Sequence, residues 1–198
     1  MHFDLVISFL LLALPTYFTP GPNNLMLMTS TAKFGFERTV PHGLGIVVGF
    51  PLMVFGVGLG LGQLFGIYPW LNTIMRYAAA VYFLWMAWHL LGIRLNPEEK
   101  AAGRPLRFLE AAAFQWVNPK AWPMATSFVS ALALTGEDRM ASIVWLTLGA
   151  LAVAPFSTVL WMVFGRQLAL FLKRSGAERA LGVALAAVMV AAVALFVF

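Results

Sequence analysis

The amino-acid sequence predicts an all-α integral membrane protein. Of the 198 residues, 61% are hydrophobic and 11% are charged, and the mean hydropathy is +0.84. A soluble core of this size could not bury so much apolar surface, so lipid must be the solvent. Six apolar stretches are long enough to cross a bilayer, and two of them contain strong helix breakers. We expect a single transmembrane domain over 1–198 and no soluble domain.

The six predicted spans follow one another with short connections, at 6–31, 40–65, 71–91, 109–134, 141–164 and 180–198. Only the segment 94–107 resembles a polar linker, and it divides the chain into two sets of three spans. Because three is odd, the second set must run opposite to the first. The sequence therefore predicts two inverted three-helix repeats, one over about 1–95 and one over about 105–198.

Positive residues predict how these spans are oriented. Of the 13 Lys and Arg residues, most lie in the odd-numbered loops, namely Lys33, Arg38, Arg94, Lys100, Arg104, Arg107, Arg166, Lys173, Arg174 and Arg179. The positive-inside rule then places these loops in the cytoplasm and both termini outside, in the bacterial inner membrane. The formal charge of +5 forms no stripe or patch, which argues against nucleic-acid binding.

The first predicted span is interrupted by Thr19-Pro20-Gly21-Pro22-Asn23-Asn24. Proline has no amide proton and clashes with the preceding turn, so carbonyl groups are freed that lipid cannot satisfy. Such backbone persists in a membrane only when it is buried in protein or lines a wet cavity. Counting from Lys33 at the helical rise puts Pro22 about 16 Å deep, close to the bilayer midplane.

A second interruption, Asn118-Pro119-Lys120, lies in the fourth span, about half a chain length away. Counting from Glu110 puts Pro119 about 14 Å deep. We expect Asn118 to be an N-cap with Pro119 as the first helical residue, and Asn23 or Asn24 to cap the other restarted helix. The free amides and partial positive charge of these two helix starts would suit a carboxylate.

Lys120 adds a full positive charge at this depth, which is costly without a partner. Two interpretations remain open: a substrate or gating role, or an anchor for backbone carbonyls.

Small residues in two other spans indicate close helix packing. The second span carries Gly45, Gly49 and Gly56 among others, at small-xxx-small spacings. The alternative is that this bare backbone lines a substrate path. Alanines at helical spacing in the sixth span could form an oligomer face, so a homodimer is possible.

At these motifs the sequence resembles the LysE/RhtB family of bacterial amino-acid exporters. The resemblance is carried by Pro20-Gly21-Pro22-Asn23-Asn24, by Pro41-His42-Gly43-Leu44-Gly45 and by Asn118-Pro119-Lys120-Ala121-Trp122. It spans the whole chain in length, span count and motif order. It implies efflux of amino acids or related metabolites from the cytoplasm, driven by exchange for protons.

The candidate substrate-binding residues are therefore the two interruptions: Pro20, Gly21, Pro22, Asn23, Asn24, Asn118, Pro119 and Lys120. Only Asp4 and Glu110 are acids near spans, so the site lacks a carboxylate for a second cation. This favours a small neutral amino acid or derivative, whose carboxylate the helix amides and Lys120 would hold. A basic amino acid and a passive channel for metabolites are the alternatives.

The candidates for proton coupling or gating are Glu110, His42, Arg38 and Asp4. For His42 and Arg38, an interface or topology role explains the residue as well. The histidines lack ligand spacing, so we expect no metal site. Paired acids and a Ser–His constellation are missing from the spans, and we expect neither an enzyme nor a cofactor.

Overall fold

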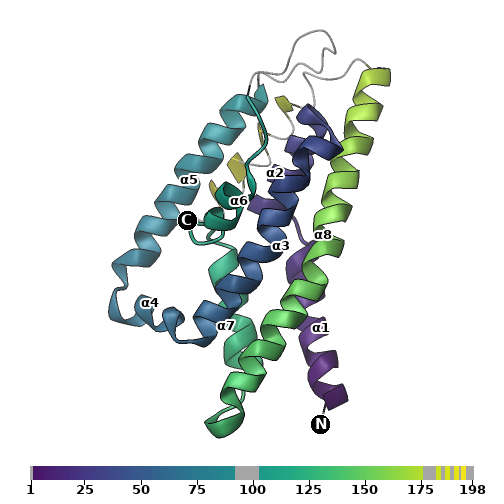
Figure 1. Cartoon of the computed structure of the whole chain (residues 1–198). Helices are drawn as coiled ribbons and strands as arrows, with labels where there is room; N and C mark the ends of the chain where they lie inside the picture. The colour runs from purple at the N-terminus through teal and green to yellow at the C-terminus, as the bar shows by residue number, and fades with distance from the viewer. Residues whose placement is uncertain are drawn as a thin grey trace.

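The computed structural model describes residues 2–91 and 103–175 and short helical pieces at 182–183, 186–187, 190–191 and 193–194. All regular structure in these residues is helical (Figure 1). The α-helices are α1 (His2–Phe18), α2 (Pro22–Phe34), α3 (Phe36–Gly58), α4 (Leu64–Ile67), α5 (Trp70–Leu91), α6 (Phe108–Phe114), α7 (Ala121–Leu132) and α8 (Arg139–Ser175). Most of the predicted sixth span lies outside the described residues.

Two helical segments, α3 and Gly136–Phe171, which includes most of α8, are each long and apolar enough to cross a membrane. A third crossing results if Asp4–Phe18 and Pro22–Phe34 count together as one span. The two helices are bent by 48° relative to each other at the short break between them. The chain leaves helical geometry between Phe18 and Pro22, where the Pro-Gly-Pro sequence removes two amide donors. The described structure is thus that of a helical membrane protein.

The helix α3 packs along α8 and α2 on one side and along α6 on the other. Two of its glycines make the contact with α6. A Cβ atom on Gly49 would lie 2.6 Å from Ala112 Cα, and one on Gly45 would overlap the Phe108 carbonyl oxygen. The backbones of α3 and α6 are therefore in direct contact here, which agrees with the packing interpretation of the glycine-rich second span.

In the fourth predicted span, α6 ends at Phe114 and α7 begins at Ala121. Turns connect the two helices, with short-range bonds such as Asn118 N to Gln115 O at 3.3 Å. The expected helix start at Pro119 was wrong by two residues, because the N-cap position belongs to Lys120. Asn118 still satisfies an amide at this helix start, since its Oδ1 accepts from Lys120 N at 3.0 Å.

The α2 cap was also predicted wrongly. Its N-cap is Gly21, without a side-chain cap hydrogen bond, and Pro22 follows as the first helical residue. Asn23 and Asn24 lie inside the first turn, and their side chains bond to other segments of the chain.

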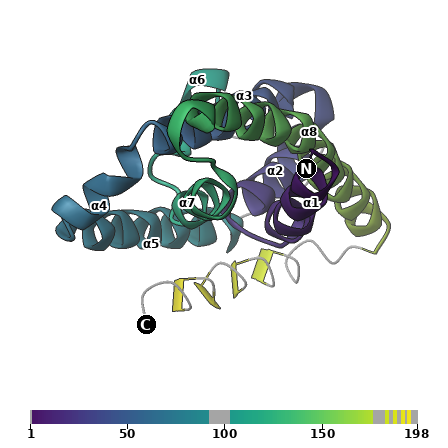
Figure 2. The same cartoon turned by 90° about the horizontal axis from the view of Figure 1, so that it is seen from below.

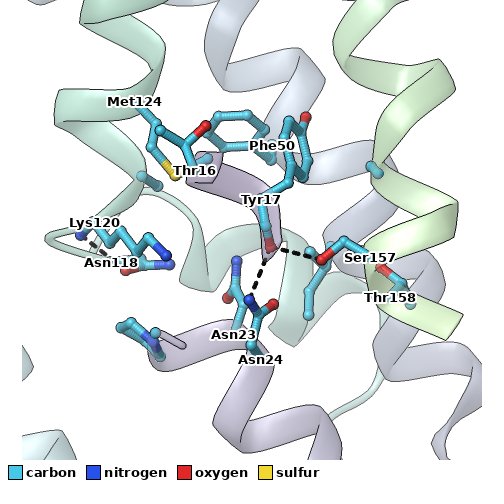
Figure 3. A pocket seen from close by; sticks show the side chains of 15 residues that line it. Thr16, Tyr17, Asn23, Asn24, Phe50, Asn118, Lys120, Met124, Ser157 and Thr158 are labelled. Carbon is cyan, nitrogen blue, oxygen red and sulfur yellow. Dashed lines mark hydrogen bonds between the residues drawn. The ribbon is translucent and has the colours of Figure 1, made fainter. Parts of the chain in front are cut away.

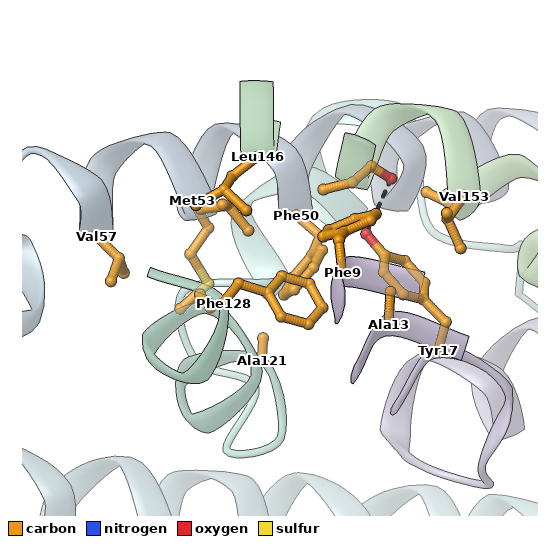
Figure 4. Close-up of a cluster of buried hydrophobic side chains, with 14 residues drawn as sticks. Phe9, Ala13, Tyr17, Phe50, Met53, Val57, Ala121, Phe128, Leu146 and Val153 are labelled. Carbon is orange, nitrogen blue, oxygen red and sulfur yellow. Dashed lines mark hydrogen bonds between the residues drawn. The ribbon is translucent and has the colours of Figure 1, made fainter. Parts of the chain in front are cut away.

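Buried aromatic side chains from α1, α3 and α7 form the main apolar core (Figure 4). Phe128 of α7 lies edge-on to Phe9 at 5.4 Å and to Phe50 at 6.2 Å between ring centroids, and it stacks on Tyr17 at 6.3 Å. Aromatic pairs at these distances add attraction beyond area burial. The core therefore fixes α7 against α1 and α3 next to both interruptions.

Candidate functional site

The two helix interruptions lie against one cavity, which is partly open to the outside. Its polar lining comes from α1, α2, α8 and the α6–α7 connection (Figure 3). The lining residues are Thr16, Tyr17, Gly21, Pro22, Asn23, Asn24, Ile46, Phe50, Asn118, Lys120, Ala121, Met124, Ala154, Ser157 and Thr158. Segments about a hundred residues apart thus share one site.

The carbonyls freed by the first interruption are satisfied by side chains. Asn24 Nδ2 donates to Tyr17 O at 2.9 Å and to Thr19 O at 2.8 Å. Ser157 of α8 donates to Tyr17 O at 2.7 Å. A buried carbonyl without a partner is costly, so these bonds stabilise the non-helical backbone.

An amide pair joins the two interruptions directly. Asn23 Nδ2 donates to Gln115 Oε1 at 2.8 Å, and Gln115 Nε2 donates to Asn23 Oδ1 at 3.2 Å. Gln115 Nε2 also donates to Ala111 O at 2.9 Å, and its side chain is fully buried. This reciprocal bond holds the start of α2 against the end of α6.

Lys120 makes the second link between the interruptions. Its ammonium donates to Thr19 O at 2.9 Å, to Thr19 Oγ1 at 2.8 Å and to Pro20 O at 3.4 Å. No carboxylate of the described residues is among its partners. The sequence left open whether Lys120 meets a substrate or anchors carbonyls, and in this structure its bonds go to carbonyls and a hydroxyl. We refer to Thr19 O, Thr19 Oγ1 and Pro20 O as the oxygen cage.

Gly21 allows this arrangement because it has no side chain. A Cβ atom there would lie 2.6 Å from Lys120 Cδ and 3.1 Å from Nζ. Its backbone is extended, with φ at −171°, so the requirement is for space and not for an unusual conformation. The lysine stem passes directly over Gly21 to reach the oxygen cage.

The remaining wall of the cavity is apolar and compact. Ile46 and Phe50 contribute from α3, and Met124 contributes from α7. Tyr17 lies edge-on to Phe50 with 5.4 Å between ring centroids, and its hydroxyl donates to Ala150 O at 3.0 Å. A polar end at the interruptions and an apolar end at α3 and α7 give the cavity two chemically distinct sides.

Of the eight predicted substrate residues, six line the cavity: Gly21, Pro22, Asn23, Asn24, Asn118 and Lys120. Pro20 contributes its carbonyl to the oxygen cage. Pro119 is not a lining residue, although it lies between two that are.

The predicted proton-coupling and gating candidates lie elsewhere. Glu110 is partly exposed and forms an ion pair with Arg104 at 2.6 Å, and it also accepts from Arg107 N at 2.9 Å. Asp4 is exposed in the first turn of α1. Arg38 is exposed in the first turn of α3, 5.8 Å from the centroid of the Phe34 ring. None of the three lines the cavity.

His42 is fully buried, and neither of its ring nitrogens has a hydrogen-bond partner among the described residues. It precedes Ile46 by one turn of α3, so it lies on the helix face that also carries Ile46 and Phe50. The cavity lining does not include it.

Sequence reasoning missed several polar residues of the site, chiefly Gln115, Tyr17, Ser157 and Thr158. Gln115 is a polar residue inside an apolar run just before an interruption, which is a signal that could have identified it. Ser157 and Thr158 are two adjacent polar residues shortly after Pro155 in the otherwise apolar fifth span. Tyr17 carries no such signal, because an aromatic residue in a span is ordinary.

Apolar spanning helices with a partly open cavity at the helix interruptions form an arrangement typical of membrane transporters. The model of one family, the LysE type translocators, matches residues 14–198. The chain therefore belongs to the LysE family of amino-acid efflux transporters, and the resemblance seen in its motifs is confirmed.

Named relatives include the cysteine/O-acetylserine efflux proteins of Escherichia coli strains K12 and O9:H4 (strain HS) and of Shigella flexneri. Each is 26% identical to this chain over 189 residues, which cover 94% of both chains. No solved structure matches the chain.

Proposed function

We propose that this protein is a secondary transporter of the inner membrane that exports small neutral amino acids or their derivatives in exchange for protons. The observation that carries the proposal is the cavity at the two helix interruptions, which offers main-chain groups of both polarities. Interrupted helices at a central site are the usual construction of substrate sites in secondary transporters.

A zwitterion fits the charges of this cavity. The first turn of α2 presents the amides of Asn23 and Asn24 at the positive end of the helix, a natural position for a carboxylate. The oxygens of Thr19 and Pro20 precede this turn and would accept an ammonium group. One amino acid can contact both the first α2 amides and the Thr19 and Pro20 oxygens, because these groups are adjacent in the chain.

Two features favour a small neutral side chain. Asp and Glu are missing from the lining residues that the structure describes, so a basic side chain would have no counter-charge. The opposite wall is formed by Ile46, Phe50 and Met124. The efflux proteins for cysteine and O-acetylserine among the relatives point to the same substrate class.

The same proposal includes the membrane arrangement. Both interruptions lie near the bilayer midplane, the two halves of the chain form inverted repeats, and both termini face outward. A homodimer through the glycine- or alanine-rich faces completes this proposal. Alternating access would then occur by movement of one repeat against the other around the site.

Counterflow in proteoliposomes tests the function. Vesicles loaded with an unlabelled amino acid at equal pH inside and outside should take up the labelled compound transiently when it is an exchanged substrate. The panel should include O-acetyl-L-serine, L-cysteine, L-serine and, for the basic alternative, L-lysine. Saturable exchange of the neutral members supports the proposal. Linear, non-saturating flux would indicate a channel, and exchange of lysine alone would indicate a basic amino-acid exporter.

A further inference from the structure

We infer that Lys120 is the proton carrier of the exchange, and that its ammonium and the ammonium of the substrate occupy the same oxygen cage in turn. This inference rests on the proposed function and deepens it. It assigns the coupling to a lysine at the interruptions and not to the acids and the histidine that the sequence suggested.

The cage is a site for an ammonium group by its chemistry. Two carbonyl oxygens and one hydroxyl oxygen lie 2.8 to 3.4 Å from Lys120 Nζ. An ammonium group has three donors and no acceptor, which matches three oxygens. In other secondary transporters the unwound carbonyls of interrupted helices hold the coupling cation. Here the cation is tethered to the protein.

The lysine blocks the position that a zwitterion needs. Its stem passes over Gly21, and Gly21, Pro22, Asn23 and Asn24 line the cavity at the start of α2. A substrate with its carboxylate on the first α2 amides would place its own ammonium near the Thr19 and Pro20 oxygens. Two cations cannot share one cage of neutral oxygens, because their repulsion is strong in a partly buried site.

This competition produces antiport. On the cytoplasmic side, Lys120 releases its proton to water, the neutral amine leaves the cage, and the substrate ammonium takes its place. On the outer side, the substrate leaves and the amine takes up a proton before it returns to the cage. One proton enters for each zwitterion that leaves, so one positive charge moves inward per cycle.

Few other titratable groups lie near the cage. Among the lining residues that the structure describes, Tyr17 alone is titratable besides Lys120, and its hydroxyl bonds to Ala150 O. The facing residues of α2, α3 and α8 are neutral. Among the side chains that the structure describes on the packed helices, the other charged or titratable groups lie outside the lining: Asp4, Lys33, Glu37, Arg38, His42, Glu110, Arg139 and Arg166.

The test uses labelled O-acetyl-L-serine in proteoliposomes with the membrane potential clamped. With the interior one pH unit more acidic, the wild type should accumulate the compound up to about tenfold, the limit for one proton per substrate. With K120M the inside-to-outside concentration ratio of the compound should stay at about 1, and counterflow at equal pH should remain measurable. Its half-saturation concentration should no longer depend on pH between 5.5 and 7, whereas that of the wild type should rise with acidity.

K120R should show no accumulation, because guanidinium keeps its proton and stays in the cage. K33M removes a lysine outside the cavity and should behave as the wild type. Accumulation by K120M or K120R at the wild-type level would overturn the inference. So would complete loss of counterflow in K120M when its melting temperature is normal, because Lys120 would then bind substrate directly. Failure of wild-type counterflow with every panel member would overturn the proposed function itself.

A pair of isomers tests the cage from the substrate side. N-acetyl-L-serine has the same atoms as O-acetyl-L-serine but no ammonium group. It should neither be exchanged nor compete with O-acetyl-L-serine in the wild type. Exchange of both isomers at similar rates would show that no ammonium is recognised, which contradicts competition for the cage.

Discussion

At the scale of single residues, the site depends on groups that bridge two distant segments. Lys120 reaches Thr19 and Pro20, and Gln115 pairs with Asn23. The positions of the interruptions could be predicted, since proline lacks an amide proton whatever surrounds it. The partner of each bridging side chain could not, because it depends on how α1 and α2 lie against the α6–α7 connection.

Gly21→Ala should disrupt the lysine bridge. The new methyl group would lie 2.6 Å from Lys120 Cδ, so the stem must move and the ammonium must leave the oxygen cage. Hydrogen bonds to charged groups contribute about 1.5–3 kcal/mol. We expect the initial rate of pH-driven uptake to fall at least roughly tenfold. Gly66→Ala is the matched control, because no atom lies within 4 Å of the added carbon. Equal loss in both variants would remove the steric explanation.

The Asn23–Gln115 pair should be energetically coupled. Interhelical hydrogen bonds in membranes contribute about 0.6 kcal/mol each and up to about 1.7 kcal/mol. Two reciprocal bonds should therefore give a coupling free energy of about 1–2 kcal/mol in a double-mutant cycle of N23A and Q115A, measured by unfolding in mixed micelles. N23A combined with S130A, at an exposed serine, should be additive. A coupling near zero for the first pair would contradict the observed bridge.

At the scale of elements, helix ends were predicted well where local chemistry decides them. The end of α1 and the start of α2 follow from the Pro-Gly-Pro sequence. The second span was expected to reach residue 65, but α3 ends at Gly58, and Gly60 then adopts a positive φ of 115°. The fifth span was expected to end at residue 164, yet α8 continues to Ser175. Hydropathy marks where a helix leaves lipid, whereas the helix itself can continue into water.

Contact of α3 with α6 through glycine gives a prediction at this scale. Gly49→Ala would place a methyl group 2.6 Å from Ala112 Cα, which belongs to rigid backbone, so the two helices must separate. Overpacking of this kind costs about 1–3 kcal/mol. For a chain of this size the melting temperature in detergent should fall by roughly 3–10 °C. Leu52→Ala, on an exposed part of α3, is the control and should shift it much less. An unchanged melting temperature for Gly49→Ala would argue against this close packing.

At the scale of the whole molecule, the orientation in the membrane can be tested cleanly because the chain has no cysteine. We predict that T135C, between α7 and α8, reacts with a membrane-impermeant maleimide in intact cells. E37C, in the first turn of α3, should react only after the membrane is opened. Both residues are exposed in the structure. The reverse pattern would invert the proposed topology, and each variant must retain counterflow for its labelling to count.

The class of protein was predictable at this scale, because mean hydropathy and span length depend on the whole chain. The cavity was expected only in outline. Its apolar wall joins Ile46, Phe50 and Met124 from two helices, and no local pattern in the sequence brings these residues together.

That wall has a consequence for how substrate preference can change among related chains. Apart from the Thr19 hydroxyl, the groups offered to the zwitterion are main-chain oxygens and amides, which most substitutions leave in place and which suit every amino acid alike. Ile46, Phe50 and Met124, in contrast, are ordinary side chains that one mutation can enlarge or shorten. Selection could thus retune the preferred metabolite through a few wall positions while the export machinery stays intact. Chains that share the interruption motifs would then be expected to differ in what they carry.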